Sequence, residues 1–225
     1  MRQPDSLTED GVKKFRQQGY WQGRLFVDLI DSHATVAPDK IAIIEASTQT
    51  RLSYQQLRDQ TKNLAASLVR LGIGKSDVVS IQAPNWPELV ICHLALNRIG
   101  AVFLPLHHGF READIKHLLE HTNAKAFIYP GTYKGFDYRV ILENIKDQLP
   151  DLQKKVVMRE NPLEGELSFE ALASDSSWVE QFGDDFLEEH RPDSVESRHI
   201  MVSSGTTSKP KCAVYCDDAT IFKIV

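Results

Sequence analysis

Residues Asp77–Leu106, with the sequence DVVSIQAPNWPELVICHLALNRIGAVFLPL, decide the fold of this chain. Asp77–Ala83 is a short apolar run typical of a buried strand, and Ala101–Leu106 is a second such run. Pro87 stands between them, at a position where a helix can begin without losing a hydrogen bond. The apolar segment Pro87–Ile99 then ends before a glycine, as helices often do. The stretch predicts a strand, a helix and a second strand in succession.

The same alternation continues on both sides of this stretch. Ser53, followed three residues later by Gln56, has the capping-box pattern of a helix start. The further helices that we expect are Leu25–Ala37, Tyr54–Leu71, Glu112–His121, Val140–Gln148 and one that begins near Ala219 after Asp217 or Asp218. The further strands are Lys40–Ile44 with its hairpin partner Gln49–Ser53, then Lys125–Tyr129, Lys155–Met158, Arg198–Ser203 and Cys212–Tyr215. We therefore predict an α/β fold with a mostly parallel sheet covered by helices on both faces.

Composition excludes several classes of protein. The 225 residues are 42% hydrophobic and 25% charged, which is enough apolar material for a folded core. The formal net charge is −5 and no basic block is present, so we expect no nucleic-acid partner. The N-terminus has no apolar secretion signal, and no apolar run is long enough to cross a membrane. Three cysteines cannot form a disulfide framework, so we predict a cytoplasmic location.

Residues Glu160–Ser197 differ in character from the rest, because they are acidic and lack periodicity. We expect a solvated connection with one or two short helices. A regulatory acidic segment is the alternative, and an exposed linker is the favoured interpretation.

The loop Ser203–Lys211 concentrates groups that suit phosphate chemistry. It holds five hydroxyl side chains, one glycine and two lysines within nine residues. Backbone N–H groups in such a turn can surround an anion, and the lysines add positive charge. The pattern lacks the glycine spacing of a Walker A loop or of a dinucleotide-binding loop. On composition alone, a flexible loop remains the favoured interpretation.

A resemblance to a known family adds to this picture. Ile200–Lys211 is similar to the AMP-binding signature of the adenylate-forming superfamily, which includes acyl- and aryl-CoA synthetases. Upstream segments resemble further motifs of the family: Leu52–Leu57, Leu71–Val79, Asn85–Glu88 and Gly100–Pro105. Gly19-Tyr20-Trp21 is similar to the start of dihydroxybenzoate-type aryl-acid ligases. The sequence departs from the common pattern at Ser208, Cys212 and Asp217, where glycine, glycine and histidine are usual.

The resemblance implies an ATP-dependent ligase. A carboxylic acid would attack the α-phosphate of ATP to give an acyl-adenylate, and a thiol, usually coenzyme A, would take the acyl group. Mg²⁺ would accompany the ATP. The resemblance implies that the following residues bind the ATP phosphates: Ser203, Ser204, Gly205, Thr206, Thr207, Ser208, Lys209 and Lys211. It implies no catalytic residue and no metal ligand within these 225 residues.

The resemblance also implies a domain organisation. Residues 1–190 would form an N-terminal α/β subdomain, and residues 191–225 would begin a second subdomain that carries the phosphate loop. The C-terminal domain of the family would be absent, so we expect the isolated chain to be inactive. A non-catalytic α/β module that binds a partner chain remains an alternative, with self-association through the open edge of the sheet.

Three other features favour plainer interpretations. His107-His108 follows a buried strand at an edge where ligands often bind, yet an ordinary loop histidine pair is favoured. Cys212 and Cys216 lack the second ligand pair of a zinc site. Ser204-Gly205 does not fit the nucleophile motif of a serine hydrolase, so we reject that class.

Overall fold

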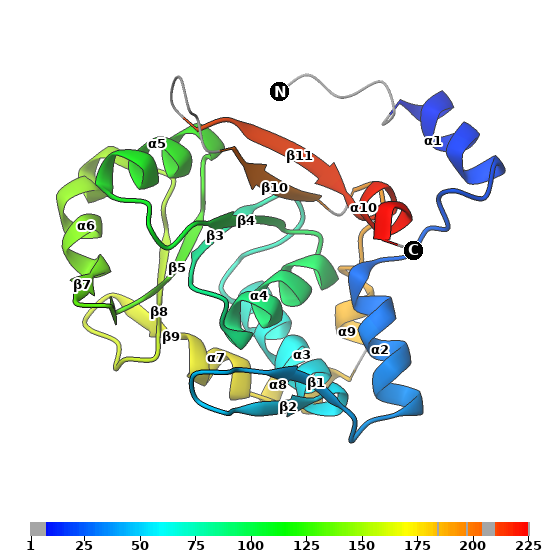
Figure 1. Ribbon diagram of the computed structural model, residues 1–225, viewed down its shortest axis with the longest axis horizontal. Coiled ribbons are helices and arrows are strands. Elements are labelled where there is room, and N and C mark those ends of the chain that lie inside the picture. Colours follow the sequence, from blue (N-terminus) through cyan, green and yellow to red (C-terminus); the bar gives the residue numbers. More distant parts are fainter. Residues whose placement is uncertain (1–7, 184, 197, 204–209, 225) are drawn as a thin grey trace.

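A mostly parallel sheet forms the centre of the molecule (Figure 1). The structure is a computed structural model that describes residues 8–183, 185–196, 198–203 and 210–224. In these residues the sheet has seven strands, in the spatial order β11 (Cys212–Cys216), β10 (Arg198–Val202), β4 (Val102–Leu106), β3 (Val78–Gln82), β5 (Ala126–Pro130), β8 (Lys154–Met158) and β9 (Glu166–Ser168). All pairings are parallel except that of β10 with β11. The parallel strands therefore end at one common edge, which we call the carboxyl edge.

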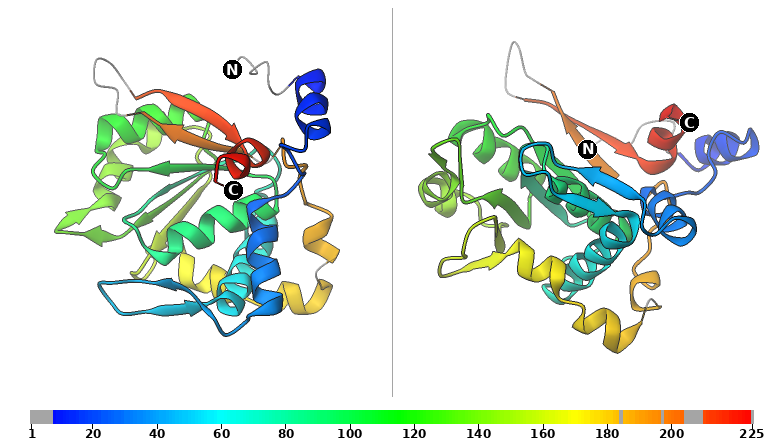
Figure 2. Two further views of the ribbon diagram at one scale, coloured as in Figure 1. Left: turned by 45° about the vertical axis from the view of Figure 1, so that its right-hand side comes forward. Right: turned by 60° about the horizontal axis from the view of Figure 1, so that its bottom comes forward.

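Helices cover both faces of this sheet, as Figures 1 and 2 show. On one face lie α5 (Glu112–Thr122) and α6 (Tyr138–Ile145). On the other face lie α3 (Tyr54–Arg70), α4 (Pro87–Arg98) and α7 (Phe169–Ser174). This two-sided covering explains why the central strands are apolar along their whole length.

Successive residues of each central strand enter opposite layers of the core. In β5, Ala126 and Ile128 join the cluster beneath α3 and α4, whereas Phe127 and Tyr129 join the cluster beneath α5 and α6. Because side chains alternate across a strand, one apolar run fills both cores.

The remaining elements surround this framework. They are α1 (Glu9–Gln17), α2 (Phe26–Val36), the hairpin β1 (Ile41–Ile44) and β2 (Arg51–Ser53), the short hairpin β6 (Thr132–Tyr133) and β7 (Phe136–Asp137), a 3₁₀ turn (Lys146–Gln148), α8 (Ser177–Phe182), α9 (Asp185–Glu188) and α10 (Asp217–Ile224). Helix α2 packs beside α3 and α4, and α10 follows β11 directly. The N-terminal helices and α10 thus meet at one side of the molecule (Figure 1).

The predicted strand, helix and strand of residues 77–106 are confirmed as β3, α4 and β4. The helix start at Ser53 is confirmed as well. Its hydroxyl accepts a hydrogen bond from the Gln56 N–H at 3.2 Å, and the Gln56 side chain accepts one from the Ser53 N–H at 2.9 Å. The α/β class that we predicted is the observed fold.

The segment 160–197 is more structured than its composition indicates. Strand β9 extends the sheet beside β8, and α7 packs against α3 with Phe169 buried. A few apolar residues among many acidic ones are enough for this, because Phe169, Ala173 and Leu187 fall on the sides of their elements that meet the core. The hairpin β6–β7 and helix α1 also form without having been predicted.

The capping box yields a stability prediction. Ser53→Ala should lower the free energy of unfolding by about 1 kcal/mol, because an N-terminal N–H of α3 loses its acceptor. Urea denaturation of both proteins measures the difference. Ser32→Ala, on the exposed side of α2, is the control and should change stability by less than about 0.5 kcal/mol. Equal effects of the two substitutions would contradict the capping role.

Candidate functional site

The predicted phosphate loop connects β10 to β11. The Ser203 N–H donates to the Lys211 carbonyl at 2.9 Å, and the Lys211 N–H donates to the Ser203 hydroxyl at 3.1 Å. These two bonds close the neck of the loop just beyond the last pair of the hairpin, Val202 with Cys212. Ser203 and Lys211 are thus brought together at the carboxyl edge. The other six candidates lie outside the described residues: Ser204, Gly205, Thr206, Thr207, Ser208 and Lys209.

Asp217 anchors the other end of the hairpin. This residue is 0% exposed, and its Oδ2 accepts hydrogen bonds from the Phe26 N–H at 2.8 Å and from the Asn97 side-chain amide at 2.7 Å. The Asn97 oxygen in turn accepts from the Val27 N–H at 3.1 Å. The departure from the family pattern at Asp217 therefore has a structural role, which is to tie the start of α10 to α2 and α4.

Asp218 makes a second set of contacts beside the first. Its Oδ1 accepts from the N–H groups of Gln22 at 3.1 Å and Gly23 at 3.0 Å. Its Oδ2 accepts from the Ser194 hydroxyl at 2.6 Å and lies 3.7 Å from the Arg16 guanidinium. Because both carboxylates are buried and hydrogen-bonded, they hold the hairpin base and the N-terminal segment in one arrangement.

A row of ring contacts runs along the carboxyl edge. The Trp86 and Tyr133 rings meet edge to face at 5.4 Å, and Tyr133 meets His108 in the same way at 5.7 Å. His108 lies 4.3 Å from His107. These rings follow β3, β5 and β4, so the topology brings them together from three separate loops.

Two buried side chains position the histidine loop. The Gln82 amide donates to the carbonyls of His107 at 2.9 Å and Phe110 at 3.1 Å. The Tyr138 hydroxyl donates to the His108 carbonyl at 2.8 Å. The backbone after β4 is therefore held by side chains from two elements, β3 and α6.

The electrostatics of this loop favour an anion. Burial lowers the pKa of His108, and the positive charges of His107, Lys134 and Arg111 lower it further. The His108 ring is consequently neutral near pH 7, and the basic side chains of Lys134 and Arg111 lie close to it. The loop thus presents positive charge at the edge where the chain brings Ser203 and Lys211 together.

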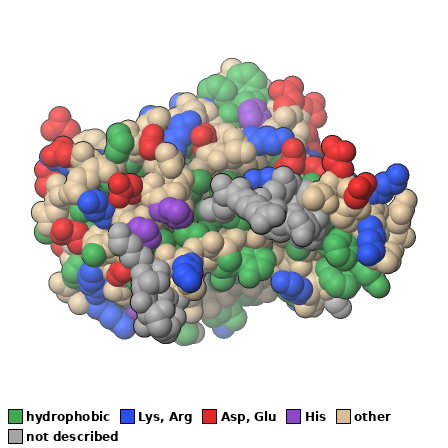
Figure 3. Space-filling view, turned by 90° about the horizontal axis from the view of Figure 1, so that it is seen from above, with side chains coloured by type: hydrophobic (Ala, Val, Ile, Leu, Met, Phe, Trp, Pro, Cys, Tyr) green, Lys and Arg blue, Asp and Glu red, His purple; other side chains and the backbone are tan. Residues whose placement is uncertain are grey.

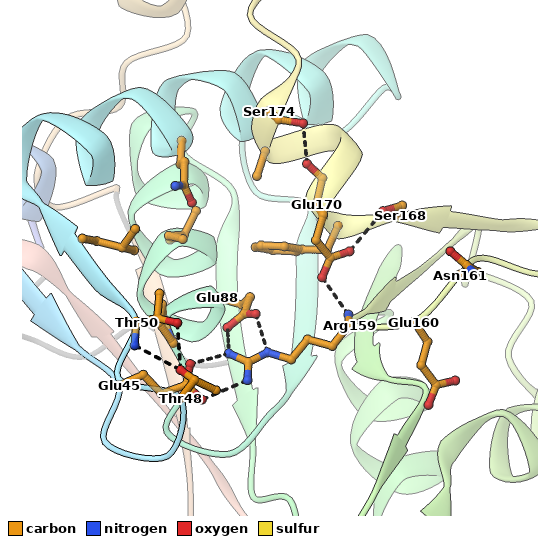
Figure 4. Close-up of a pocket in the computed structure, with 16 residues that line it drawn as sticks. Glu45, Thr48, Thr50, Glu88, Arg159, Glu160, Asn161, Ser168, Glu170 and Ser174 are labelled. Atoms are coloured by element: carbon orange, nitrogen blue, oxygen red, sulfur yellow. Dashed lines mark hydrogen bonds and ion pairs between the residues drawn. The ribbon is translucent and has the colours of Figure 1, made fainter.

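Arg159, which follows β8, joins three parts of the molecule (Figure 4). Its guanidinium lies 2.8 Å from a carboxylate oxygen of Glu45 and 2.6 Å from one of Glu88, and it stacks 3.8 Å from the centre of the Trp86 ring. The hydrogen bonds from Arg159 lower the pKa of Glu45 to about 2. Arg159 therefore ties hairpin β1–β2 and the start of α4 to the carboxyl edge.

A cleft of about 840 Å³ opens beside this network (Figure 4). Its walls come from the β1–β2 hairpin, the start of α4 and helix α7, with Leu52, Ile91 and Phe169 among the apolar lining residues. Ser203 and Lys211 do not line it. The cleft is therefore separate from the two described ends of the loop.

Charged side chains are mixed over the face that Figure 3 shows. Acidic and basic groups alternate across its described residues, without a broad region of one sign. This distribution agrees with the acidic net charge and gives no footprint for a nucleic-acid backbone on this face.

Sequence reasoning missed the Arg159 network and the partners of Asp217 and Asp218. Glu88 in the first turn of α4 was a usable signal, since acidic residues are common there, but it points to helix stability only. A lone arginine after a strand carries no pattern that would reveal its three partners.

Comparisons with known proteins agree with this geometry. The family model described as AMP-binding enzyme matches residues 30–223. The 2,3-dihydroxybenzoate-AMP ligase of Bacillus subtilis (strain 168) is 38% identical over 160 residues, which cover 70% of this chain and 28% of that protein. The medium-chain fatty-acid–CoA ligase of Escherichia coli (strain K12) is 29% identical over 211 residues, or 92% of this chain and 35% of the relative. The chain thus spans about a third of the length of these curated relatives.

Solved structures share the fold. The apo structure of Mycobacterium smegmatis MbtA aligns with a TM-score of 0.76 at 24% identity, over 97% of this chain and 40% of that one. The anthranilate CoA ligase AuaEII, solved with anthranoyl-AMP, aligns with a TM-score of 0.70 at 20% identity, over 87% of this chain and 35% of that one.

Two features are absent from the described residues. None of their helices combines the length and the apolar character that crossing a membrane requires. They also contain no group of three or more His, Cys, Asp or Glu side chains arranged to hold a metal ion.

The Arg159 network yields a prediction with a pH dependence. Glu45→Gln should lower the free energy of unfolding at pH 7 by about 1 kcal/mol, because the partly exposed Arg159 guanidinium loses the charged partner that the buried Glu45 supplies. The pKa of Glu45 is lowered in the folded state, so its contribution is complete above pH 4.5 and is lost as the pH falls towards 2. In Glu45→Gln, the free energy of unfolding should therefore lack the decrease that Glu45 causes between pH 4.5 and 2. Urea denaturation at several pH values measures the free energy of unfolding. Glu164→Gln, at an exposed position, is the control. The same pH dependence in both variants would exclude the role assigned to Glu45.

Proposed function

The chain belongs to the AMP-binding enzyme family, and from this membership we propose that it carries the phosphate-binding, N-terminal part of an ATP-dependent carboxylic acid–thiol ligase. The observation that carries the proposal is the extent of the family match, residues 30–223, which includes the whole loop between β10 and β11. The closed neck at Ser203 and Lys211 supports it, because a phosphate loop needs its two ends held together.

The proposed reaction has two steps. The carboxylate of the acid attacks the α-phosphate of ATP, which forms an acyl-adenylate and releases pyrophosphate. The sulfur of a thiol, coenzyme A in our proposal, then attacks the acyl carbon and displaces AMP. A carboxylate is already a nucleophile, so the chain has to position and stabilise charge rather than to remove a proton.

We assign the loop to the phosphates of ATP. Its backbone N–H groups and hydroxyls would donate to phosphate oxygens, and Lys211 would add a charge-assisted bond. The neutral His108, with Lys134 and Arg111 near it, would keep the adjoining edge positive. The full set comprises Ser203, Ser204, Gly205, Thr206, Thr207, Ser208, Lys209 and Lys211.

Mg²⁺ would neutralise part of the polyphosphate charge. The described residues do not form a metal-binding cluster, so they do not fit a resident ion, and we derive no step through it. We propose that the ion arrives with the nucleotide and that coenzyme A is bound largely by residues outside this chain.

We propose an aromatic carboxylic acid as the substrate class. The support is the Bacillus subtilis relative named for 2,3-dihydroxybenzoate and the Vibrio cholerae relative of the same kind, 33% identical over 147 residues. The Escherichia coli relative named for medium-chain fatty acids keeps an aliphatic acid as the competing class.

Three further expectations stay proposals. One is a division near residue 191 between an N-terminal subdomain and the start of a second one. Another is a cytoplasmic location. The last is the partner-binding alternative, in which a second polypeptide or a second copy pairs with β11; the place of β11 at the end of the sheet supports it.

Protection of Lys211 tests the phosphate role directly. Lys211 is exposed, so it reacts with lysine-modifying reagents, and millimolar MgATP should slow this reaction. Lys14, exposed on α1, should react at the same rate with and without the nucleotide. Mass spectrometry of the labelled peptides measures both rates. Unchanged labelling of Lys211 would contradict the proposed role and favour the partner-binding module.

Substitution of the same residue gives a second prediction. Lys211→Ala should weaken MgATP binding by about 10- to 100-fold through loss of a charge-assisted hydrogen bond. Its melting temperature should not change, since the side chain is exposed. Lys14→Ala is the matched control, with unchanged affinity. Calorimetric titration measures all three proteins, and wild-type affinity in Lys211→Ala would remove this residue from the site.

A further inference from the structure

Two histidines meet where the β10–β11 hairpin joins the sheet. His93 of α4 and His199 of β10 have ring centroids 5.8 Å apart. The Phe103 ring stacks on His93 at 4.5 Å, and the Tyr215 ring stacks on His199 at 5.7 Å. Phe26 of α2 contacts both histidines, at 5.3 and 6.2 Å. The pair thus lies inside an aromatic cluster built from α2, α4, β4, β10 and β11.

This cluster reinforces a narrow connection. Strand β10 pairs with β4 at a single residue pair, His199 with Phe103, whereas β10 and β11 share five pairs. Strands β3 and β4 also share five. On one face the hairpin is held by the packing of His93, His199 and the surrounding rings, and on the other by Ile200, Val202 and Val214, which pack against the cluster beneath α5 and α6.

The surroundings of the pair disfavour a proton. His199 is 7% exposed, and its Nδ1 has no hydrogen-bond partner among the described residues; its Nε2 lies 3.3 Å from the Thr220 hydroxyl. Burial lowers the pKa of both histidines, and for His93 the proximity of His199 lowers it further, to about 4. A positive charge on either ring would be both desolvated and next to the other ring.

The acidic groups on α2, α4 and α10 are engaged with other partners, and Arg198, which precedes His199 on β10, is exposed. On α10, the Asp217 and Asp218 carboxylates bind the N-terminal segment, Asn97, Ser194 and Arg16. On α2, Asp28 binds Arg191 and Asp31 binds Arg98, and at the start of α4 Glu88 binds Arg159. Burial raises the pKa values of the nearby thiols of Cys92 and Cys216. The Lys223 cation lies 5.1 Å from the Tyr215 ring. Lys223 adds positive charge on this side of the cluster.

We propose that the His93–His199 contact is a proton-sensitive joint: protonation of either ring in mildly acidic conditions releases the β10–β11 hairpin from the sheet and weakens phosphate binding by the loop that the hairpin carries. The release follows from the cluster itself, whereas the effect on phosphate rests on the proposed function.

The direction of the pH effect follows from proton linkage. In the released hairpin both rings face water and titrate near pH 6.5, whereas in the docked hairpin they stay neutral to lower pH. The opening equilibrium is therefore constant above pH 6.5. Below that value it rises by about tenfold per pH unit for each histidine that gains a proton.

Hydrogen exchange of the complete 225-residue chain measures this opening. Exchange of β10 and β11 amides is followed between pH 7.5 and 5.5 and corrected for the intrinsic pH dependence of exchange. We expect the opening constant of these amides to rise by about 5- to 30-fold from pH 6.5 to 5.5, for one or two protons gained, while amides of β3 and β5 stay unchanged. A pH-independent opening constant, or an equal rise throughout the sheet, would overturn the joint.

Variants separate the two rings from other histidines. His93→Phe keeps an aromatic ring against Phe103 and removes one titrating group. The opening constant of the hairpin should therefore change with pH no more steeply than the gain of a single proton allows. The control is His121→Phe on α5, because His121 is exposed and stacks on His117 at 5.7 Å, nearly the same ring separation. Its slope should equal that of the unaltered chain. An unchanged pH dependence of hairpin opening in His93→Phe would also overturn the joint. If that variant does not fold, His93→Gln replaces it, and the pH dependence measured for the unaltered chain still tests the joint.

The link to phosphate is tested with MgATP as the probe. Its affinity for the chain should fall between pH 7.5 and 5.5 in parallel with hairpin opening, and His93→Phe should reduce the fall. Opening without any binding of MgATP at pH 7.5 would leave the joint intact and overturn the proposed function. Opening at pH 5.5 with unchanged MgATP affinity would overturn the coupling alone.

Discussion

Two adjacent buried carboxylates, those of Asp217 and Asp218, hold together parts of the chain that lie almost 200 residues apart. They accept hydrogen bonds from the backbone N–H groups of Gln22, Gly23 and Phe26. Buried carboxylates are costly to leave uncompensated. The two carboxylates therefore need this segment in place. The position of α2, the end of α4 and the base of the β10–β11 hairpin all depend on this one exchange of hydrogen bonds.

The hairpin that carries the proposed phosphate loop is consequently held in two unequal ways. Its base is fixed by hydrogen bonds to charged groups, which tolerate little displacement. Its junction with the sheet combines one strand pair, a cluster of rings around His199 on one face and aliphatic packing around Ile200 on the other. Ring packing is less directional than hydrogen bonding, so this second attachment is the place where the hairpin can move while its base stays in position. A loop that admits and releases a polyphosphate benefits from this combination.

Much of the framework could be predicted from local patterns in the sequence. The strand, helix and strand of residues 77–106 follow from apolar runs and a helix-starting proline, and the start of α3 from Ser53 and Gln56. The site was harder. Its loop residues were found through a family signature, whereas Arg159 was missed because its partners come from different elements and leave no trace at one spacing. Asp217 has the sequence pattern of a helix cap, and only the folded chain shows its partners on α2 and α4.

The order of strands in the sheet has a consequence for how the chain is made. The first strand of the sheet to be synthesised, β3, lies near its centre, and β4 and β5 then add on opposite sides. Each new strand on one side, β5, β8 and β9, meets a partner that has already left the ribosome. The free edge of β4, however, waits for β10 while residues 107–197 are translated, about 5–20 s at ordinary rates of synthesis. During that interval an apolar strand edge stands unpaired, which makes the nascent chain, rather than the finished protein, the species most in need of a chaperone.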